Sequence, residues 1–475
     1  MKKIKKQPIS LRPHQQQAFD SVITAIKDGK GSAVGRVVMP TGAGKTFVEA
    51  AVLDYQVANN TRTRIHLVLA PRIMLANQLI EEFRTFSGPT YRAIAFHSGT
   101  HEPEYEKIKW QEKATTRYEV VVEEYTKAVN KNQDLVVFST YHSCGKLKLT
   151  DFDTIIADES QYAVAEGFHE AIKSLTARVK LFFTATEKHT ASDNGRGLNN
   201  ETVYGKRLFT IKPAELIKLG LIVAPRLHVM YGETDNSDKS VIDEVIQLVQ
   251  GQDDLTRPEM GFSKILFAMK DTGDVKTIID NRYKLQAAFP GHDIFTITSK
   301  TGAMINGVEV QRNHFMRELK NTKRENVLIF HYDILSEGID VDGITGVVIM
   351  RNMGLAKLQQ TIGRAIRIYK PNPGMKKQAW ISVPVINGNE DDMAHVRDTV
   401  KAIRNGGYDI SAEDVIETGK PAHQGDETNV PDAVNAYKSN YSNLFIESVF
   451  HDIETNEFWE DLSSKSDDDL LNALV

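Results

Sequence analysis

A short glycine-rich segment contains the residue types that bind phosphate groups. It follows the short expected strand 35–38, opens an apolar stretch that is expected to be helical, and reads Met39-Pro40-Thr41-Gly42-Ala43-Gly44-Lys45-Thr46. Glycines let backbone N–H groups converge on phosphate oxygens, and the helix N-terminus adds a favourable dipole. The segment predicts a site in which Lys45 contacts β- and γ-phosphates and the Thr46 hydroxyl binds Mg²⁺. Met39 stands where the general pattern has its first glycine, and the alternative is a turn with a surface lysine.

Two adjacent carboxylates, Asp158 and Glu159, end the apolar stretch 154–157. An enzyme with a phosphate-binding loop needs one acid to hold Mg²⁺ and a second to orient the attacking water. In isolation, such a pair is more often a helix cap and a solvated acid. The glycine-rich segment about 110 residues upstream favours the catalytic interpretation.

Two arginines near residue 365 have a spacing that suits a helix. Arg364 and Arg367 are three residues apart, which on a helix places both guanidinium groups on one face. Such a pair can stabilise γ-phosphate charge, as an arginine finger does. The alternative is a helix with two exposed arginines.

The elements that must position these residues are short, β-branched apolar runs. They occupy residues 65–70, 135–140, 154–157, 180–184, 264–269, 293–298, 327–330, 347–350 and 379–385. Near-continuous apolar strands indicate sheets that are buried on both faces. Because helical stretches separate the runs, the pattern predicts an α/β fold with parallel sheets.

The runs form two groups, which predicts domains at 1–225 and 226–390, with a connection and a helix at 241–249 between the groups. A charged helical insertion is expected at 101–131, where Trp110 either packs on the surface or stacks on a base. After residue 385 the pattern weakens, and a small, mostly helical region at 391–475 is expected.

Composition and charge narrow the class of protein. Apolar residues make up 41% and charged residues 25% of the 475 residues, which is typical of soluble globular chains. Cys144 is the only cysteine, so an intrachain disulfide is excluded and a reducing cytoplasmic setting is expected. No run of 18 apolar residues occurs, so no membrane association is expected.

Charge is distributed unevenly along the chain. Residues 391–475 contain 6 lysines and arginines against 19 acids, which leaves 52 basic against 44 acidic residues, a net of +8, in 1–390. A basic body indicates polyanion binding, although an ordinary surface with a solubilising tail is an equal alternative. The acidic stretch 452–469 could also mimic DNA or dock a replication or recombination protein.

Together these segments resemble the superfamily 2 helicases and translocases over nearly all of residues 10–385. In chain order, the segments that resemble the Q-motif region and motifs I, Ia, Ic, II, III, IV, V and VI are 11–15, 40–46, 70–72, 138–141, 158–161, 184–186, 265–267, 336–340 and 360–367. Their order is that of the family.

The resemblance implies two tandem RecA-like domains with ATP and Mg²⁺ between them. It assigns to the ATP site Arg12, Gln15 (on the adenine edge), Pro40, Thr41, Gly42, Ala43, Gly44, Lys45, Thr46, Asp158, Glu159, Gly338, Asp340, Arg364 and Arg367. The expected nucleic-acid contacts are Pro71, Arg72, Ser139, Thr140, Thr298, Ser299 and Lys300. Such phosphate contacts position a strand without reading its sequence.

Two departures from the family's usual motifs indicate which branch of the family the chain resembles. Motif II ends in Ser160-Gln161, which disfavours a DEAD-box RNA helicase, and motif VI begins with Gln360, as in DNA-translocating branches. In these features the chain resembles the phage UvsW, RecG-like branch-migration and restriction-type helicases. The expected function is ATP-driven movement on DNA that unwinds or remodels duplex or branched substrates, in recombination or repair. An RNA helicase and an ATP-gated clamp without unwinding remain as alternatives.

Overall fold

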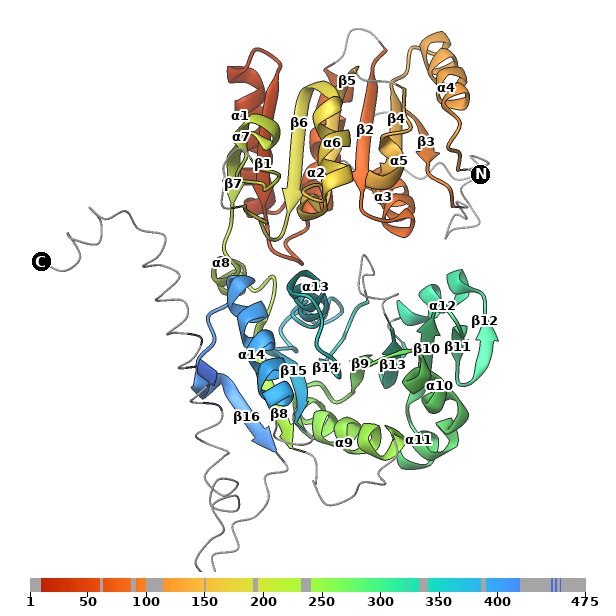
Figure 1. Ribbon diagram of the computed structural model, residues 1–475, viewed down its shortest axis with the longest axis vertical. Coiled ribbons are helices and arrows are strands. Elements are labelled where there is room, and N and C mark those ends of the chain that lie inside the picture. Colours follow the sequence, from red (N-terminus) through yellow and green to blue (C-terminus); the bar gives the residue numbers. More distant parts are fainter. Residues whose placement is uncertain are drawn as a thin grey trace, which may run out of the picture. The chain divides into compact units, whose positions relative to one another are not determined.

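The computed structural model describes residues 10–59, 63–86, 91–99, 114–148, 151–190, 195–231, 241–321, 323–332, 341–385 and 390–418, with Ile446, Val449, Phe450 and Ile453. The chain divides into two compact units, Met1–Leu216 and Ile217–Val475 (Figure 1). The strand β8, Ala224–Tyr231, crosses the boundary expected between residues 225 and 226 and belongs to the second unit.

The first unit contains a seven-stranded, fully parallel sheet with the order β3-β4-β2-β5-β6-β1-β7. Its strands are β1 Ala33–Val38, β2 Ile65–Ala70, β3 Arg92–Phe96, β4 Leu135–Thr140, β5 Asp151–Ala157, β6 Thr176–Thr184 and β7 Lys206–Thr210. Its helices are α1 Pro13–Asp28, α2 Lys45–Ala58, α3 Ile73–Phe86, α4 Tyr118–Asn130, α5 Tyr141–Cys144, α6 Glu166–Ser174 and α7 Glu201–Tyr204, and α8 Pro213–Lys218 leads into the second unit.

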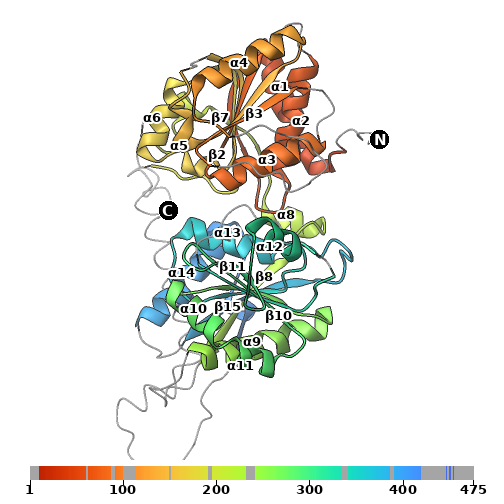
Figure 2. The same ribbon diagram turned by 90° about the vertical axis from the view of Figure 1, so that its right-hand side faces the viewer.

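Helices cover both faces of this sheet, which explains why its central strands β2, β4 and β5 are buried over nearly their whole length. Figure 2 shows α1 and α2 on one side and α5 and α6 on the other. Every residue of β4 is buried, as a strand covered on both faces requires. The runs 65–70 and 135–140 therefore predicted β2 and β4 with their observed bounds.

The charged insertion is described only in part. Its second half contains α4, which confirms a helix there, while residues 101–113 with Trp110 lie outside the described residues. The short edge strands β3 and β7 were missed, because each has five residues and neither stands out as an apolar run.

The second unit contains a nine-stranded sheet with the order β12-β11-β10-β13-β9-β14-β15-β8-β16. Its strands are β8, β9 Lys264–Ala268, β10 Asp293–Thr298, β11 Gly302–Ile305, β12 Val308–Val310, β13 Val327–His331, β14 Gly346–Ile349, β15 Gln378–Val385 and β16 Val415–Thr418. Its helices are α9 Val241–Met260, α10 Thr272–Asp280, α11 Arg282–Ala288, α12 Arg312–Leu319, α13 Leu355–Ala365 and α14 Glu390–Asn405. Only the β10–β11–β12 meander is antiparallel. Within the described ranges, no helix is long and apolar enough to cross a membrane.

Two expectations for this unit need correction. The helix at 241–249 extends to Met260, and it follows β8 of the same sheet rather than connecting two domains. The region after residue 391 also adds a strand, because β16 pairs with β8 over four residues. Most of the acidic tail lies outside the described residues.

A buried polar network attaches β16 to the sheet. The His228 ring lies 3.0 Å from Ser382 Oγ through Nδ1 and 2.8 Å from Thr418 Oγ1 through Nε2. Burial lowers the pKa of His228 from 6.5 to about 4. Folded His228 is therefore neutral at pH 7, and the unfolded state binds its proton more readily as the pH falls.

This linkage predicts an acid-sensitive second unit. Stability from His228 is present above pH 6.5 and falls by about 2.5 kcal/mol at about pH 4.5, if only this group is counted. Urea unfolding followed by the fluorescence of Trp380, which lies beside His228 on β15, measures this loss. Trp110 and Trp459 would be replaced by phenylalanine so that Trp380 alone reports. In His228→Gln the free energy of unfolding should fall less on acidification, by about 2.5 kcal/mol, than it does in the wild type. An unchanged pH dependence of the free energy of unfolding would contradict the assignment of this loss to His228.

Candidate active site

The carboxyl ends of β1, β5 and β6 meet at one edge of the first sheet. Val38 at the end of β1 pairs with Thr184 at the end of β6, and Ala157 on β5 pairs with Phe182 on β6. The Met39 N–H donates to the Thr184 carbonyl at 2.9 Å. The glycine-rich loop and the acid pair therefore leave the two strands that flank β6, at the same edge of the sheet.

The glycine-rich loop requires glycine at two positions. Gly42 and Gly44 have φ of +87° and +80°, in the left-handed region that side chains disfavour. A Cβ on Gly44 would also collide with the Gln15 amide. The close approach of Gln15 and the sharp turn into α2 thus explain the glycines.

The first helix holds this loop. The His14 ring lies 2.9 Å from the Ala43 carbonyl through Nε2, and Gln15 Nε2 donates to the same oxygen at 3.0 Å. Gln15 Oε1 accepts from the Arg12 N–H at 2.9 Å. The nitrogen end of the Gln15 amide therefore contacts the phosphate loop, while its oxygen end contacts Arg12, and the expected contact of Gln15 with adenine stays a prediction. His14 was missed in the sequence because a lone histidine beside a glutamine carries no distinctive signal.

Lys45 connects the loop to the acid pair. Its side chain is buried, and Nζ lies 3.5 Å from the Met39 carbonyl and 3.7 Å from Glu159 Oε1. The ammonium group is therefore at the start of α2, where the predicted phosphates would be.

Asp158 and Glu159 have different environments. Asp158 is buried, and burial together with the charge of Glu159 raises its pKa to about 7. Glu159 has φ of +47°, a left-handed conformation that is costly for a residue with a side chain, and its N–H donates to Asp158 Oδ1 at 2.8 Å. The strained turn places two carboxylates on successive residues at one sheet edge.

A third carboxyl group lies beside this pair. Glu49 lies one turn after Lys45 on α2 and is fully buried. Burial and the neighbouring Asp158 raise the pKa of Glu49 well above its usual range. The sequence offered one signal for Glu49, because this acid lies between Val48 and Ala50 on an apolar helix.

A hydrogen-bonded chain connects Glu159 to the end of β6. Gln161 Nε2 donates to Glu159 Oε2 at 2.7 Å, and the Thr184 hydroxyl lies 2.7 Å from Gln161 Oε1. Gln161 and Thr184 are both buried. Motif II and motif III are thus connected directly through side chains.

The residues expected to contact nucleic acid differ in exposure. In the first unit, Arg72 is exposed after β2, with Pro71 partly buried beside it. Ser139 and Thr140 are buried at the end of β4, where Ser139 Oγ donates to the Phe96 carbonyl and Thr140 Oγ1 accepts from the Ser143 N–H. Those two hydroxyls stabilise the backbone at this edge.

Tyr141 connects the two halves of this edge. Tyr141 directly follows Thr140, and its buried hydroxyl donates to the Asp158 carbonyl at 2.7 Å. The expected nucleic-acid segment and the acid pair are therefore joined by one hydrogen bond, which the sequence did not reveal.

The second unit presents a similar edge at the end of β10. Thr298 is buried and accepts from the N–H groups of Lys300 and Thr301, whereas Ser299 and Lys300 are exposed. Gly338 and Asp340 lie outside the described residues.

The expectation that Arg364 and Arg367 share one helix face is wrong. Helix α13 ends at Ala365, and Arg367 pairs with Ile222 in an isolated bridge. The buried Lys376 ammonium donates to the carbonyls of Ala365 and Arg367 and to that of Ile344. Capping of the freed carbonyls by Lys376 explains why the helix stops between the two arginines.

Comparisons with known proteins agree with this geometry. Residues 8–189 match the family model "Type III restriction enzyme, res subunit". A putative ATP-dependent RNA helicase of Acanthamoeba polyphaga mimivirus is 23% identical over 384 residues, which cover 77% of this chain and 63% of that protein.

Solved structures show the same fold. The Type ISP restriction-modification enzyme LlaBIII bound to DNA superposes with a TM-score of 0.69 at 16% identity, over 94% of this chain and 33% of that enzyme. A DEAD-box helicase bound to single-stranded RNA superposes with a TM-score of 0.53 at 15% identity, over 87% of this chain and 79% of the other. The chain thus corresponds to about a third of the larger restriction enzyme.

The matching family model covers the glycine-rich loop, the acid pair and the Thr184 turn, and both units have the parallel α/β architecture of helicase motor domains. With the motifs in the family's order, and with those of the glycine-rich loop, the acid pair and the Thr184 turn at one edge of the first sheet, the chain is similar to the helicases of superfamily 2.

Proposed function

We propose that this protein is a DNA-dependent ATPase that moves on DNA and unwinds or remodels duplex or branched substrates. The observation that carries the proposal is the assembly of Lys45, Asp158 and Glu159 at one edge, with Glu159 held by Gln161. This arrangement contains a phosphate-binding cation, a metal-binding acid and a water-orienting acid, the parts that ATP hydrolysis requires.

In this proposal Lys45 neutralises the β- and γ-phosphates of ATP, and Glu159 orients or deprotonates the attacking water. Lys45 reaches both the loop carbonyl of Met39 and Glu159, so the phosphates and the water would be adjacent. Arg364 and Arg367 would stabilise the charge of the transferred phosphoryl group. Arg364 lies in the last turn of α13, and Arg367 lies just beyond that helix.

Thr46 and Asp158 would hold Mg²⁺, which neutralises charge on the phosphate oxygens. Among the described residues, no group of three or more histidines, cysteines or acids is arranged to hold a metal ion. This fits Mg²⁺, which enzymes commonly bind through one or two protein oxygens together with substrate phosphates and water. The hydroxyl and the carboxylate are both the hard oxygen ligands that Mg²⁺ prefers.

DNA is the proposed track for three reasons. The matching family model describes a restriction enzyme subunit, the LlaBIII structure contains DNA, and residues 1–390 carry a net charge of +8. Exposed Arg72, Ser299 and Lys300 follow the carboxyl ends of strands in the two units and would contact phosphates. A role in recombination or repair, with branched DNA as the substrate, is part of this proposal.

An RNA helicase is the second candidate, and the description of the mimivirus relative and the RNA-bound structure favour it. An ATP-gated clamp that binds without unwinding is the third candidate. Both would use the same ATP site, so only the nucleic-acid response separates them from the proposal.

Two substitutions test the ATP site. Lys45→Ala should abolish turnover and weaken ATP binding, because it removes the charge that faces the phosphates. Glu159→Gln should retain ATP binding and lower kcat by about 10²–10⁴-fold, the usual contribution of a positioned acid or base. Phosphate release measures kcat, and binding of a fluorescent ATP analogue measures affinity. Lys27→Ala, at the exposed end of α1, is the control, and wild-type turnover in Lys45→Ala would refute the site.

The track is tested by ATPase activity with no nucleic acid, single-stranded DNA, duplex DNA, a four-way junction and single-stranded RNA. We expect stimulation by DNA, greatest with the junction, and strand displacement in a separate assay. Stimulation by RNA alone would select the RNA helicase, because discrimination would then use the 2′-hydroxyl. DNA affinity that depends on nucleotide, without strand displacement, would select the clamp.

Lys300→Ala tests the phosphate contacts of the second unit. Loss of one phosphate contact should weaken DNA binding equally for all sequences and reduce the slope of log affinity against log salt by about 1. Lys323→Ala is the matched control, because this exposed lysine precedes β13 and so lies at the opposite end of the same parallel strands. Equal effects of the two substitutions would exclude a specific contact at Lys300.

A further inference from the structure

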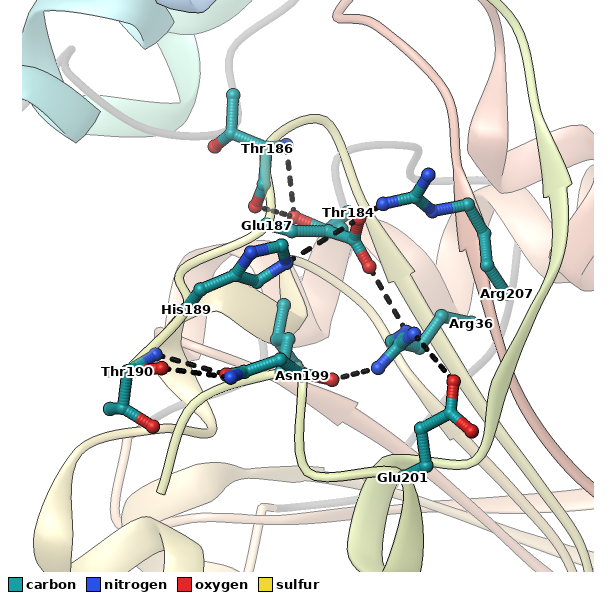
Figure 3. Close-up of polar contacts among 10 residues, drawn as sticks. Arg36, Thr184, Thr186, Glu187, His189, Thr190, Asn199, Glu201 and Arg207 are labelled. Atoms are coloured by element: carbon teal, nitrogen blue, oxygen red, sulfur yellow. Dashed lines mark hydrogen bonds and ion pairs between the residues drawn. The ribbon is translucent and has the colours of Figure 1, made fainter. Parts of the chain in front are cut away.

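A buried ion pair lies directly after motif III. Glu187 follows Thr184-Ala185-Thr186, and its Oε1 lies 3.0 Å from Nε of Arg36 on β1 (Figure 3). Both side chains are only 6% exposed. A charged pair this deeply buried is costly to desolvate and is strongly disrupted when one partner is removed.

Glu187 is held from two strands at once. Its Oε2 pairs with Arg207 on β7, and β7 pairs with β1, which carries Arg36. Arg36 also donates to the Leu198 carbonyl and lies 3.7 Å from Glu201. Because both arginines stand on neighbouring strands of one sheet, they form a rigid frame around the Glu187 carboxylate.

Glu187 is the last residue of the turn 184–187, and this turn also orients Thr184. The Thr186 N–H donates to Thr184 Oγ1 at 3.1 Å (Figure 3). The same hydroxyl lies 2.7 Å from Gln161 Oε1. Gln161 in turn donates to Glu159. A shift of the 184–187 turn would therefore move the amide that fixes the Glu159 carboxylate.

We propose that Glu187, clamped by Arg36 and Arg207, is a positioning residue that sets the orientation of Glu159 through Thr184 and Gln161. This inference rests on the proposed function of Glu159 in ATP hydrolysis. Glu187 contacts neither ATP nor water in this proposal. It determines the conformation of the turn whose hydroxyl holds Gln161.

The central test is Glu187→Gln, which keeps the size of the side chain and removes its charge. We expect kcat to fall by about ten- to a hundredfold, because small displacements of a catalytic group carry costs of this size. ATP affinity should stay within about twofold, because Glu187 pairs with Arg36, Arg207 and His189 and not with Lys45. A kcat equal to wild type in folded protein would overturn the proposal.

Asp153→Asn is the matched control for loss of an ion pair in the same unit. Asp153 is 8% exposed and pairs with Arg64 at 2.7 Å, but it lies toward the amino end of β5, away from Thr184. This variant should lose thermal stability and keep its kcat. If it loses kcat as strongly as Glu187→Gln, the effect is general destabilisation and the proposal is wrong.

A double-mutant cycle with Thr184→Val tests whether Glu187 acts on Glu159 through the Thr184 hydroxyl. Thr184→Val removes the hydroxyl that holds Gln161, so adding Glu187→Gln should lower kcat little further. Multiplicative losses in the double variant would mean that Glu187 acts by another route and would overturn the proposal.

Arg207→Gln provides a second variant in case Glu187→Gln does not fold. Arg207 is 46% exposed, so its removal weakens the clamp while Arg36 still pairs with Glu187. We expect a several-fold loss of kcat at unchanged ATP affinity, and an unchanged kcat counts against the proposal. Wild-type protein without ATPase activity on any nucleic acid would instead refute the proposed function, so the two failures are distinguishable.

Discussion

The parallel pairing of β1 with β6 is the constraint on which the site depends. It places the phosphate-binding loop, the Thr184 turn and, through β5, the acid pair at one edge of the first sheet. In a parallel sheet the carboxyl ends of all strands lie at the same edge, so parallel pairing alone brings together residues that are far apart in the chain. The expected nucleic-acid segments after β2 and β4 occupy the other half of the same edge.

The acidic and basic groups at this edge are unequal in number, which suits the binding of a charged substrate. Three carboxyl groups, Glu49, Asp158 and Glu159, interact electrostatically with the ammonium group of Lys45. Burial raises the pKa of both Glu49 and Asp158, which shows how costly a second and third negative charge are there. A divalent cation offsets such charge when it binds, and in the proposed function Mg²⁺ arrives with ATP.

Rigid connections extend from this edge into the rest of each unit. Tyr141 joins the end of β4 to the Asp158 carbonyl, and Arg36 with Arg207 joins the Thr184 turn to two strands. In the second unit, Lys376 caps the helix that carries Arg364, and His228 attaches β16. Buried hydrogen bonds and ion pairs of this kind restrict the conformations that such turns can adopt.

The sequence by itself determined the α/β class, the positions of the central strands and the residue types of the ATP site. These follow from local physics, because an apolar run buried on both faces and a glycine-rich phosphate loop are visible in neighbouring residues. The edge strands β3, β7 and β16 and the end of α13 before Arg367 came only from tertiary structure. So did the contacts of Glu49, Tyr141 and the Arg36–Glu187 pair, since each joins segments that are distant in the chain. Pairing partners across such distances are decided by which surfaces the fold brings together, and no local pattern records that choice.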